Sequence, residues 1–551
     1  MSQILNEVKQ ELKLEDEELD EEEDDEELEE EELDEEDDEE EELEDDEEEE
    51  LEEEEDPQPQ QIQILDYQVE HFKKILQILQ NEPGYLDVSE FGCGKTIIAL
   101  AIAATFGMSI GLVGPKTILN AWKTQAKKYG IHIYFALSYN ALRGTAKYGT
   151  SHDLLNREGS VFTTTDTFEE CAKNGLLLVF DECHNLKNEN EQLEAAHCLT
   201  REVVRLAKTG YNVRIAALSA TPADKKENIT SLFKVLGVIT NPKLYTYIRS
   251  SKTYVLEGLQ EAVNKCNKYD PDVTFHVLCR PVNKTTSKMI CHELYTRVLK
   301  KIVTSSMPRP ESEYEKDIKN LYAIMPPEDV ERMKKGALLF SSATSYKHET
   351  QEISYSGMNW GMVTQSRREI DSAKVATMVR LSKEKLDKYP NCKVVLYYTF
   401  KRDMYRSEEL LKKYNPLVMN GDVTDENVRT DMMNKFQRND NKYRVFISNP
   451  KVGGLGVELD DKYGHKPRFM FIAPSYMFID QFQATGRIHR KGTKSKATIR
   501  FIYSKDFNYE TGILTSMMEK SKVARDMTQA NQKDIVFPGE LPDETEGEEE
   551  E

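Results

Sequence analysis

The stretch Ser89-Glu90-Phe91-Gly92-Cys93-Gly94-Lys95-Thr96 decides how the rest of the chain is interpreted. An apolar, turn-rich run, 83–88, precedes it, and an aliphatic helix pattern, 97–103, follows it. A strand, a glycine loop and a helix in this order are typical of a phosphate-binding P-loop. Backbone N–H groups of such a loop close around phosphate oxygens, and the helix N-terminus adds a positive dipole. We therefore expect a nucleotide site here.

Individual residues of this loop have expected roles as cofactor-binding residues. Lys95 is expected to reach the β- and γ-phosphates and to act in catalysis, and Thr96 to offer its hydroxyl to Mg²⁺. Gly92 and Gly94 let the backbone approach the phosphates. Ser89 stands where the usual G-x-x-x-x-G-K-[ST] form has its first glycine. Taken alone, the loop is also consistent with a chance glycine-rich turn, so the other motifs have to decide.

Charge is distributed unevenly along the 551 residues, whose formal net charge is −28. Residues 1–56 contain 39 acidic residues and two lysines, and residues 540–551 add eight acidic residues. The middle, 57–539, has 70 basic against 53 acidic residues. This basic body suits a protein that binds phosphate backbones, although an ordinary lysine-rich surface gives the same balance.

The acidic block 15–56 has almost no apolar residues apart from isolated leucines. It cannot bury enough apolar surface to fold alone, and we expect it to be disordered. Its role is either solubility or, as a sharper hypothesis, that of a nucleic-acid mimic which covers the basic body.

Cysteine spacing and hydropathy indicate the cellular compartment in which the protein is expected. The eight cysteines form no C-x-x-C pair. Cys279, Cys291 and His292 lie close together in sequence but lack a fourth zinc ligand at a sensible spacing. We expect free thiols in a reducing compartment. With neither a signal peptide nor an apolar run long enough for a membrane span, the expected location is intracellular, without a membrane partner.

Polar residues beside the P-loop motif are candidates for contacts with ligands. Gln68 opens a helical pattern upstream of the loop and is a candidate for the adenine edge; a solvated helix glutamine fits the pattern equally well. Lys116 and Trp122 follow a buried-strand pattern, and lysines there suit a phosphate track, while core packing is the default for the indole. Thr163 and Thr164 end a strand pattern, where hydroxyls suit phosphate oxygens or a helix cap.

Two carboxylates stand at the end of a fully apolar run, 176–180, of the parallel-strand type. They begin the sequence D-E-C-H at Asp181, in the place where doubly wound sheets bind ligands. Asp181 is expected to hold Mg²⁺, and Glu182 to orient or deprotonate the attacking water. A second buried-strand pattern, 214–218, ends in S-A-T-P from Ser219. The P-loop, D-E-C-H and S-A-T-P in this order are hard to produce by chance.

This series of motifs resembles superfamily 2 helicases, in which two RecA-like lobes bind ATP between them. Within that superfamily, residues 65–68, 115–122 and 163–165 make the chain most similar to the Swi/Snf-type DNA translocases. The G-R-I-H-R wording that starts at Gly486 is closer to helicase-like proteins of large DNA viruses, which include transcription-associated ATPases. The resemblance covers about residues 62–510 and implies the use of ATP and Mg²⁺ and a nucleic-acid partner.

The resemblance also implies roles for residues of the second half. Gly456 and Glu458 lie in a stretch that resembles the family's fifth motif, where Glu458 replaces the usual asparagine. Gln483, Arg487 and Arg490 match Q-x-x-G-R-x-x-R. Arginines three apart on a helix face the same way, and these two are expected to act as arginine fingers on the γ-phosphate. The alternative is a surface helix with salt-bridged arginines.

Two further positions acquire an interpretation from the same resemblance. Ser89 fits the related helicase form A-x-x-G-x-G-K-T, which has a small residue at this place. Thr399 ends a strand pattern of the second lobe and is expected near nucleic acid.

The predicted fold class is α/β, with two RecA-like lobes whose parallel sheets are flanked by helices, a helical insertion between them, and disordered acidic tails. The expected limits are 1–60 for the acidic tail, 61–240 for the first lobe, 241–371 for the insertion, 372–525 for the second lobe and 526–551 for the C-terminal tail.

Three functions fit these motifs. The first is a translocase that couples ATP hydrolysis to movement on duplex DNA, in remodelling or with the transcription machinery. The second is a strand-separating RNA or DNA helicase, since the D-E-C-H box occurs in RNA helicases too. The third is a nucleotide-gated scaffold whose acidic tails bind a basic protein.

Overall fold

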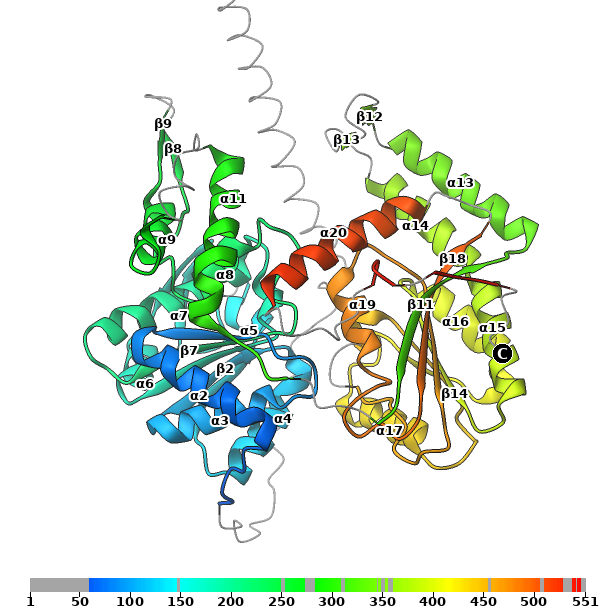
Figure 1. The fold of residues 1–551 in the computed structure, drawn as a ribbon, viewed down its shortest axis with the longest axis horizontal. Helices are drawn as coiled ribbons and strands as arrows, with labels where there is room; N and C mark the ends of the chain where they lie inside the picture. Colours follow the sequence, from blue (N-terminus) through cyan, green and yellow to red (C-terminus); the bar gives the residue numbers. More distant parts are fainter. Residues whose placement is uncertain are drawn as a thin grey trace, which may run out of the picture. The chain divides into compact units, whose positions relative to one another are not determined.

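The structure, a computed structural model, describes most of the chain from residue 59 onward (Figure 1). The described ranges are 59–145, 149–248, 253–272, 283–308, 313–343, 345–347, 352–354, 360–453, 457–505, 510–528, 538–541 and 543–546. The acidic block 15–56, Cys279 and Gly456 lie outside these ranges. Among the helices in them, none combines the length and the apolar character that crossing a membrane requires.

The chain forms two compact units, one consisting mainly of Ile324–Thr377 and a larger one that contains two parallel sheets. We call residues 59–308, with the first sheet, the first lobe. Residues 313–323 and 378–528, with the second sheet, are the second lobe. The predicted α/β class with two parallel sheets flanked by helices is confirmed, whereas the limits of the domains stay predictions.

The first sheet has the order β10-β1-β7-β6-β2-β3, and its neighbouring strands run parallel. Its strands are β1 (Gly84–Asp87), β2 (Ser109–Gly114), β3 (Ile133–Ser138), β6 (Leu176–Asp181), β7 (Val213–Leu218) and β10 (Thr304–Ser305). The helices that accompany it are α2 (Asp66–Asn81), α3 (Lys95–Phe106), α4 (Lys116–Lys128), α5 (Tyr139–Arg143), α6 (Asp166–Lys173), α7 (Glu191–Lys208) and α8 (Ile229–Val235). A separate antiparallel hairpin consists of β4 (Leu155–Glu158) and β5 (Val161–Thr164).

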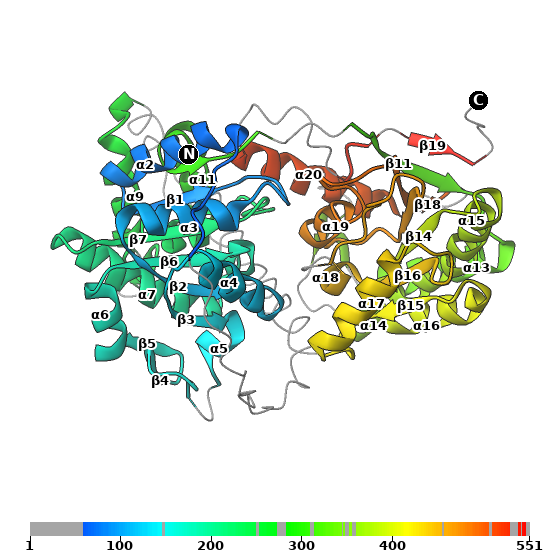
Figure 2. The same ribbon diagram turned by 90° about the horizontal axis from the view of Figure 1, so that it is seen from below.

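Alternate residues of β6 are buried in two different cores, which is why the run is apolar throughout. Leu177 and Val179 pack with residues of α2, α3 and α4, whereas Leu178 and Phe180 pack with residues of α5 to α8. Figure 2 shows α3 and α4 on one side of this sheet and α6 and α7 on the other. The carboxyl end of β6, where Asp181 lies, therefore emerges from a sheet that is covered on both faces.

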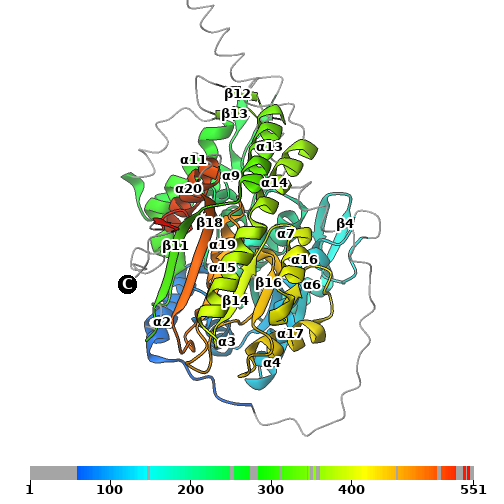
Figure 3. The same ribbon diagram turned by 90° about the vertical axis from the view of Figure 1, so that its right-hand side faces the viewer.

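The second sheet has the order β15-β16-β14-β17-β18-β11-β19 (Figure 3). Its strands are β11 (Lys316–Ala323), β14 (Lys393–Tyr397), β15 (Leu417–Met419), β16 (Val445–Ser448), β17 (Arg468–Ile472), β18 (Ala497–Ser504) and β19 (Asp543–Thr545). Its helices are α15 (Val375–Lys388), α16 (Lys401–Leu410), α17 (Glu426–Gln437), α18 (Pro450–Gly453), α19 (Phe478–Thr485) and α20 (Thr511–Met527).

The expected helical character of the insertion 241–371 is wrong for Lys316–Ala323, which forms β11. This strand lies between β18 and β19, and Asn320 is opposite Asp543 in the parallel pairing with β19. Ile318 and Leu321 are buried. Pairing with neighbouring strands overrides a weak local helix preference, as tertiary context commonly does.

The remaining elements come from residues 246–373. They are β8 (Thr246–Ile248), β9 (Thr253–Val255), α9 (Glu257–Asn267), α11 (Lys284–Leu294), a π-helical turn (Tyr295–Leu299), α12 (Lys300–Val303), α13 (Pro327–Ala343), β12 (Ser345–Lys347), β13 (Glu352–Ser354) and α14 (Trp360–Ala373). Helices α9 and α11 contribute buried side chains to the core of the first lobe, among them Leu259 and Leu294.

Candidate nucleotide site

The loop between β1 and α3 has the backbone that a P-loop requires. Gly92 and Gly94 have φ of +76° and +95°, a conformation that side chains other than hydrogen disfavour. A Cβ at Gly94 would come 2.6 Å from Nε2 of Gln68. Lys95 is the first residue of α3, and half-buried Thr96 follows it at the positive end of the helix dipole.

Gln68 lies against this loop. Its side chain is 2% exposed, donates from Nε2 to the carbonyl oxygen of Cys93 at 2.8 Å and accepts from the N–H of Leu65 at 3.0 Å. The hydroxyl of Tyr67 donates to the same Cys93 carbonyl at 3.0 Å. Gln68 therefore ties the start of α2 to the loop, while its expected contact with an adenine edge stays a prediction.

Three hydrogen bonds connect Ser89 with its surroundings. Its hydroxyl accepts the N–H of Met307 at 2.8 Å, and its own N–H donates to Oδ1 of Asp87 at 2.9 Å. Its carbonyl oxygen accepts from Nζ of Lys95 at 3.0 Å. The Lys95 ammonium also lies 5.3 Å from the ring centroid of Phe91. The side chain expected to bind cofactor thus holds the loop in place, and Lys95 is held beside it.

A buried pair under the loop was missed by the sequence reasoning. His71 Nε2 lies 2.9 Å from Oδ2 of Asp87, and both side chains are fully buried. His71 Nδ1 lies 2.8 Å from the hydroxyl of Ser305 on β10. Burial alone would raise the pKa of Asp87, but the charge and hydrogen bond of His71 outweigh it and the net shift is downward. The one available signal was an aspartate at the end of an apolar strand.

Replacing His71 by alanine is expected to lower the free energy of unfolding by about 3–5 kcal/mol at neutral pH, because Asp87 then stays buried without its partner. The wild-type pair stabilises the fold above the ordinary aspartate pKa of about 4 and less as the pH falls. In the variant, the carboxyl takes up a proton more readily, so the deficit shrinks toward pH 5. Unfolding followed at both pH values checks this. Lys73→Ala, which removes an exposed pair with Glu70 on the same helix, is the control; equal stability of the two variants contradicts the prediction.

Asp181 is held at the end of β6 by two donors. Its Oδ2 accepts from the indole N–H of Trp122 at 2.7 Å, and its Oδ1 accepts from the backbone N–H of Glu182 at 2.9 Å. Burial raises the pKa of Asp181 to about 6, and the Glu182 carboxylate adds to the rise. Trp122 is 2% exposed. This burial corrects the expected contact of Trp122 with nucleic acid. Its indole is packed in the core, and the N–H of the indole orients Asp181.

Glu182 stands in a strained backbone conformation, with φ of +50° and ψ of 51°. Its Oε2 lies 3.3 Å from Nδ1 of His184, which in turn lies 3.1 Å from the hydroxyl of Ser219. Burial would raise the pKa of Glu182, but the hydrogen bond from His184 and the charge of Lys95 lower it on balance. An ionised carboxylate is the form that a general base needs.

The two arginines do not lie on a helix, which corrects that expectation. Helix α19 ends at Thr485, and the chain continues irregularly through Arg487 and Arg490. Arg490 donates from Nη1 to Oε1 of Glu458 at 2.8 Å and from Nη2 to the carbonyl oxygen of Val457 at 3.0 Å. Glu458, expected to bind cofactor, thus pairs with Arg490.

Arg487 is 6% exposed, and its Nε has no hydrogen-bond partner among the described residues. Burial lowers its pKa to about 10, with Arg490 contributing, and the Glu182 carboxylate acts in the opposite direction. Its guanidinium lies 5.9 Å from the ring centroid of Phe91. A buried cation without a full set of partners favours an anionic ligand.

Other contacts bring the motifs of both sheets together. Gln483 is buried, and its Nε2 lies 3.4 Å from Nε2 of His184. The rings of Phe91 and Phe482 have centroids 5.8 Å apart. The structure therefore brings the P-loop, the D-E-C-H box and the Q-A-T-G-R-I-H-R stretch to one place.

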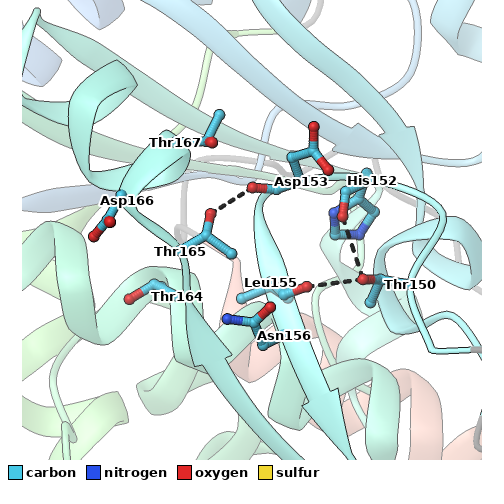
Figure 4. Close-up of a pocket in the computed structure, with 9 residues that line it drawn as sticks. All are labelled: Thr150, His152, Asp153, Leu155, Asn156, Thr164, Thr165, Asp166 and Thr167. Atoms are coloured by element: carbon cyan, nitrogen blue, oxygen red, sulfur yellow. Dashed lines mark hydrogen bonds between the residues drawn. The ribbon is translucent and has the colours of Figure 1, made fainter.

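The other candidates for nucleic-acid contact come from three further places in the fold. Lys116 is exposed at the start of α4, Thr163 is exposed on β5, and Thr399 is half-buried after β14. Thr164 lines an open pocket of about 570 Å³ whose polar lining is mainly hydroxyls and carboxylates (Figure 4). There the hydroxyl of Thr165 donates to the carbonyl oxygen of Asp153 and caps α6. Nucleic-acid contacts of these residues stay predictions.

Comparison with known proteins supports the assignment. Residues 59–224 match the family described as type III restriction enzyme, res subunit. The chain is 21% identical over 475 residues to a proposed ATP-dependent RNA helicase, L364, of Acanthamoeba polyphaga mimivirus, covering 83% of this chain and 82% of the relative. The SWI2/SNF2 ATPase core domain of Sulfolobus solfataricus matches with 16% identity and a TM-score of 0.29, over 88% of this chain and 93% of that one. That score is too low for a comparison of whole folds, so the fold assignment rests on the two sheets.

These motifs, sheets and matches together define an ATP-hydrolysing enzyme of the helicase type. The matches support the chain's resemblance to superfamily 2 helicases, including a helicase of a large DNA virus. This resemblance implies the use of ATP and the binding of nucleic acid.

Proposed function

We propose that this enzyme couples ATP hydrolysis to movement along duplex DNA. The support is the basic body of the chain, with 70 basic against 53 acidic residues in 57–539, and the Swi/Snf-like wording of residues 65–68 and 115–122. A basic body provides the sequence-independent attraction to phosphates that movement along a backbone needs. Assembly and release of the ATP site in each cycle would alternate the grip of the two lobes on the strand.

The first-lobe residues supply most of the expected chemistry. Lys95 would pair with the β- and γ-phosphates once it leaves the carbonyl of Ser89. Asp181 and the hydroxyl of Thr96 would hold Mg²⁺, since such oxygens are its preferred ligands and each Asp181 oxygen retains a lone pair beyond its single hydrogen bond. When bound, the ion neutralises charge that develops on the phosphates. Glu182 would take the proton of the attacking water.

The observation that carries the ATP-hydrolysis part of the proposal is the state of Arg487. The side chain is buried, and its Nε has no hydrogen-bond partner among the described residues. The Glu182 carboxylate acts to raise the pKa of the Arg487 guanidinium. Negative charge on a transferring phosphoryl group would satisfy it. Arg490, already paired with Glu458, would contribute less.

The second candidate is an RNA helicase, favoured by the name of the mimivirus relative and by the D-E-C-H wording. It differs from the first in the nucleic acid that accelerates ATP hydrolysis. A nucleotide-gated scaffold, the third possibility, would show no acceleration by nucleic acid.

We expect blunt duplex DNA to raise the ATPase rate, and single-stranded DNA and RNA to raise it less. Steady-state ATPase rates with the three nucleic acids at equal phosphate concentration and fixed salt check this. The acceleration should weaken as salt rises, because phosphate contacts release counterions. Greater stimulation by RNA would favour the second candidate, and no stimulation the third.

A further inference from the structure

Arg468, the first residue of β17, is a buried charge outside the motifs. Its side chain is 1% exposed and lies 5.2 Å from the ring centroid of Phe436. Burial lowers its pKa to about 10. Placing a guanidinium there is costly unless its donors are all used.

Its donors are directed mainly at main-chain carbonyl oxygens of one short segment. Nε donates to Leu459 at 2.7 Å and Nη2 to Asp460 at 3.2 Å. Nη1 donates to the carbonyl oxygen of Lys466 at 3.1 Å. Nη2 also donates to the side-chain oxygen of Gln437, at the end of α17, at 3.2 Å.

Gln437 holds the same segment from the other side. Its Nε2 donates to the carbonyl oxygen of Glu458 at 2.8 Å and to that of Asp460 at 3.1 Å. We call Arg468 and Gln437 the carbonyl clamp. Together they fix the carbonyl oxygens of residues 458–460, which include the end of the fifth-motif stretch.

This segment in turn positions both arginines of the site. The N–H of Leu459 donates to the carbonyl oxygen of Arg487 at 3.0 Å. Arg490 donates to Val457 and Glu458, as described above. Thr493 provides a further link. Its hydroxyl accepts the N–H of Arg490 at 2.7 Å and donates to the side-chain Oδ2 of Asp460 at 3.3 Å.

We propose that the carbonyl clamp is a positioning device for Arg487 and Arg490, acting through residues 457–460. The inference rests on the proposed role of these arginines in hydrolysis. Arg468 is not one of the residues expected to bind ATP, and it would act on hydrolysis only by positioning the segment that holds the two arginines. Since a displacement of about 1 Å can cost about 100-fold in rate, a loosened segment should reduce turnover while ATP binding at the P-loop persists.

The test compares Arg468→Lys with a matched variant, Arg444→Lys. Lysine keeps the charge but replaces the planar fork by a single nitrogen, which cannot reach both carbonyls. Arg444 also donates to three main-chain carbonyls of the second lobe, those of Leu386, Tyr389 and Cys392, so it controls for general loss of such contacts. We expect R468K to lower kcat about 10- to 100-fold with KM for ATP unchanged, and R444K to leave kcat near the wild-type value.

Two further variants keep the proposal falsifiable. Gln437→Met removes the other half of the clamp at similar volume and should lower kcat in the same way, even if R468K does not fold. The loss in the double variant R468K/R487A should be smaller than the two single losses combined, because the clamp acts largely through Arg487. A wild-type kcat in both clamp variants, or losses that add to that of R487A, overturns the positioning role. A wild-type kcat in R487A itself refutes the proposed arginine role instead, so the two failures are distinguishable.

Discussion

Arg487→Ala will bind ATP with near wild-type affinity and hydrolyse it about 10³–10⁵ times more slowly, the range that loss of an arginine finger covers in phosphoryl transfer. Arg487 is buried and incompletely partnered, whereas the ground-state contacts expected for ATP come from Lys95 and the loop glycines. Removing it therefore deletes an interaction that strengthens in the transition state. In kinetic terms, kcat and kcat/KM fall together.

Single-turnover hydrolysis and binding of a fluorescent ATP analogue separate the two quantities. Arg438→Ala, which removes an exposed arginine of the same lobe that pairs with Asp440, should behave like the wild type. A kcat for R487A within a few-fold of the R438A value would remove Arg487 from the mechanism.

Glu182→Gln is expected to retain ATP while losing turnover by about 10²–10⁴-fold, the usual contribution of a general base. The amide preserves the shape of the side chain but accepts no proton. Because the net effect of His184 and Lys95 holds the pKa of Glu182 low, the carboxylate is ionised at neutral pH and the loss should persist across that range. Rapid-quench measurement of product formation with ATP in excess checks this.

Glu158→Gln, at an exposed position of β4 in the same lobe, is the matched control for that change. Normal turnover in E182Q would assign the proton transfer to another group. Loss of ATP binding in E182Q would instead show that the carboxylate supports the loop.

The P-loop and the apolar strands could be predicted because local pattern and tertiary role coincide there. The run 176–180, for example, lies within β6 as expected. Such segments are apolar on the faces that the fold buries, so periodicity is sufficient. The resemblance that the motifs carry then indicated which residues are expected at the site.

The failures share a different physical cause. Lys316–Ala323 is a strand because β18 and β19 lie beside it, and those partners are far away in sequence. Arg487 and Arg490 are close together because residues 457–460 hold them, not because a helix presents both. His71 and Arg468 carry no motif, and their only signal is a polar residue near or within an apolar pattern. Their roles depend on contacts between distant segments, which one sequence does not display.

The proposed mechanism requires above all that Arg487 acts on the same phosphoryl group that the P-loop binds. Affinity for ADP with aluminium fluoride, which mimics the transferring phosphoryl group, tests this most directly. Wild-type protein should bind ADP with aluminium fluoride at least about 100-fold more tightly than ADP alone, since transition-state analogues gain at least that factor. R487A should bind ADP as the wild type does but lose this gain. An undiminished gain in R487A would contradict the account.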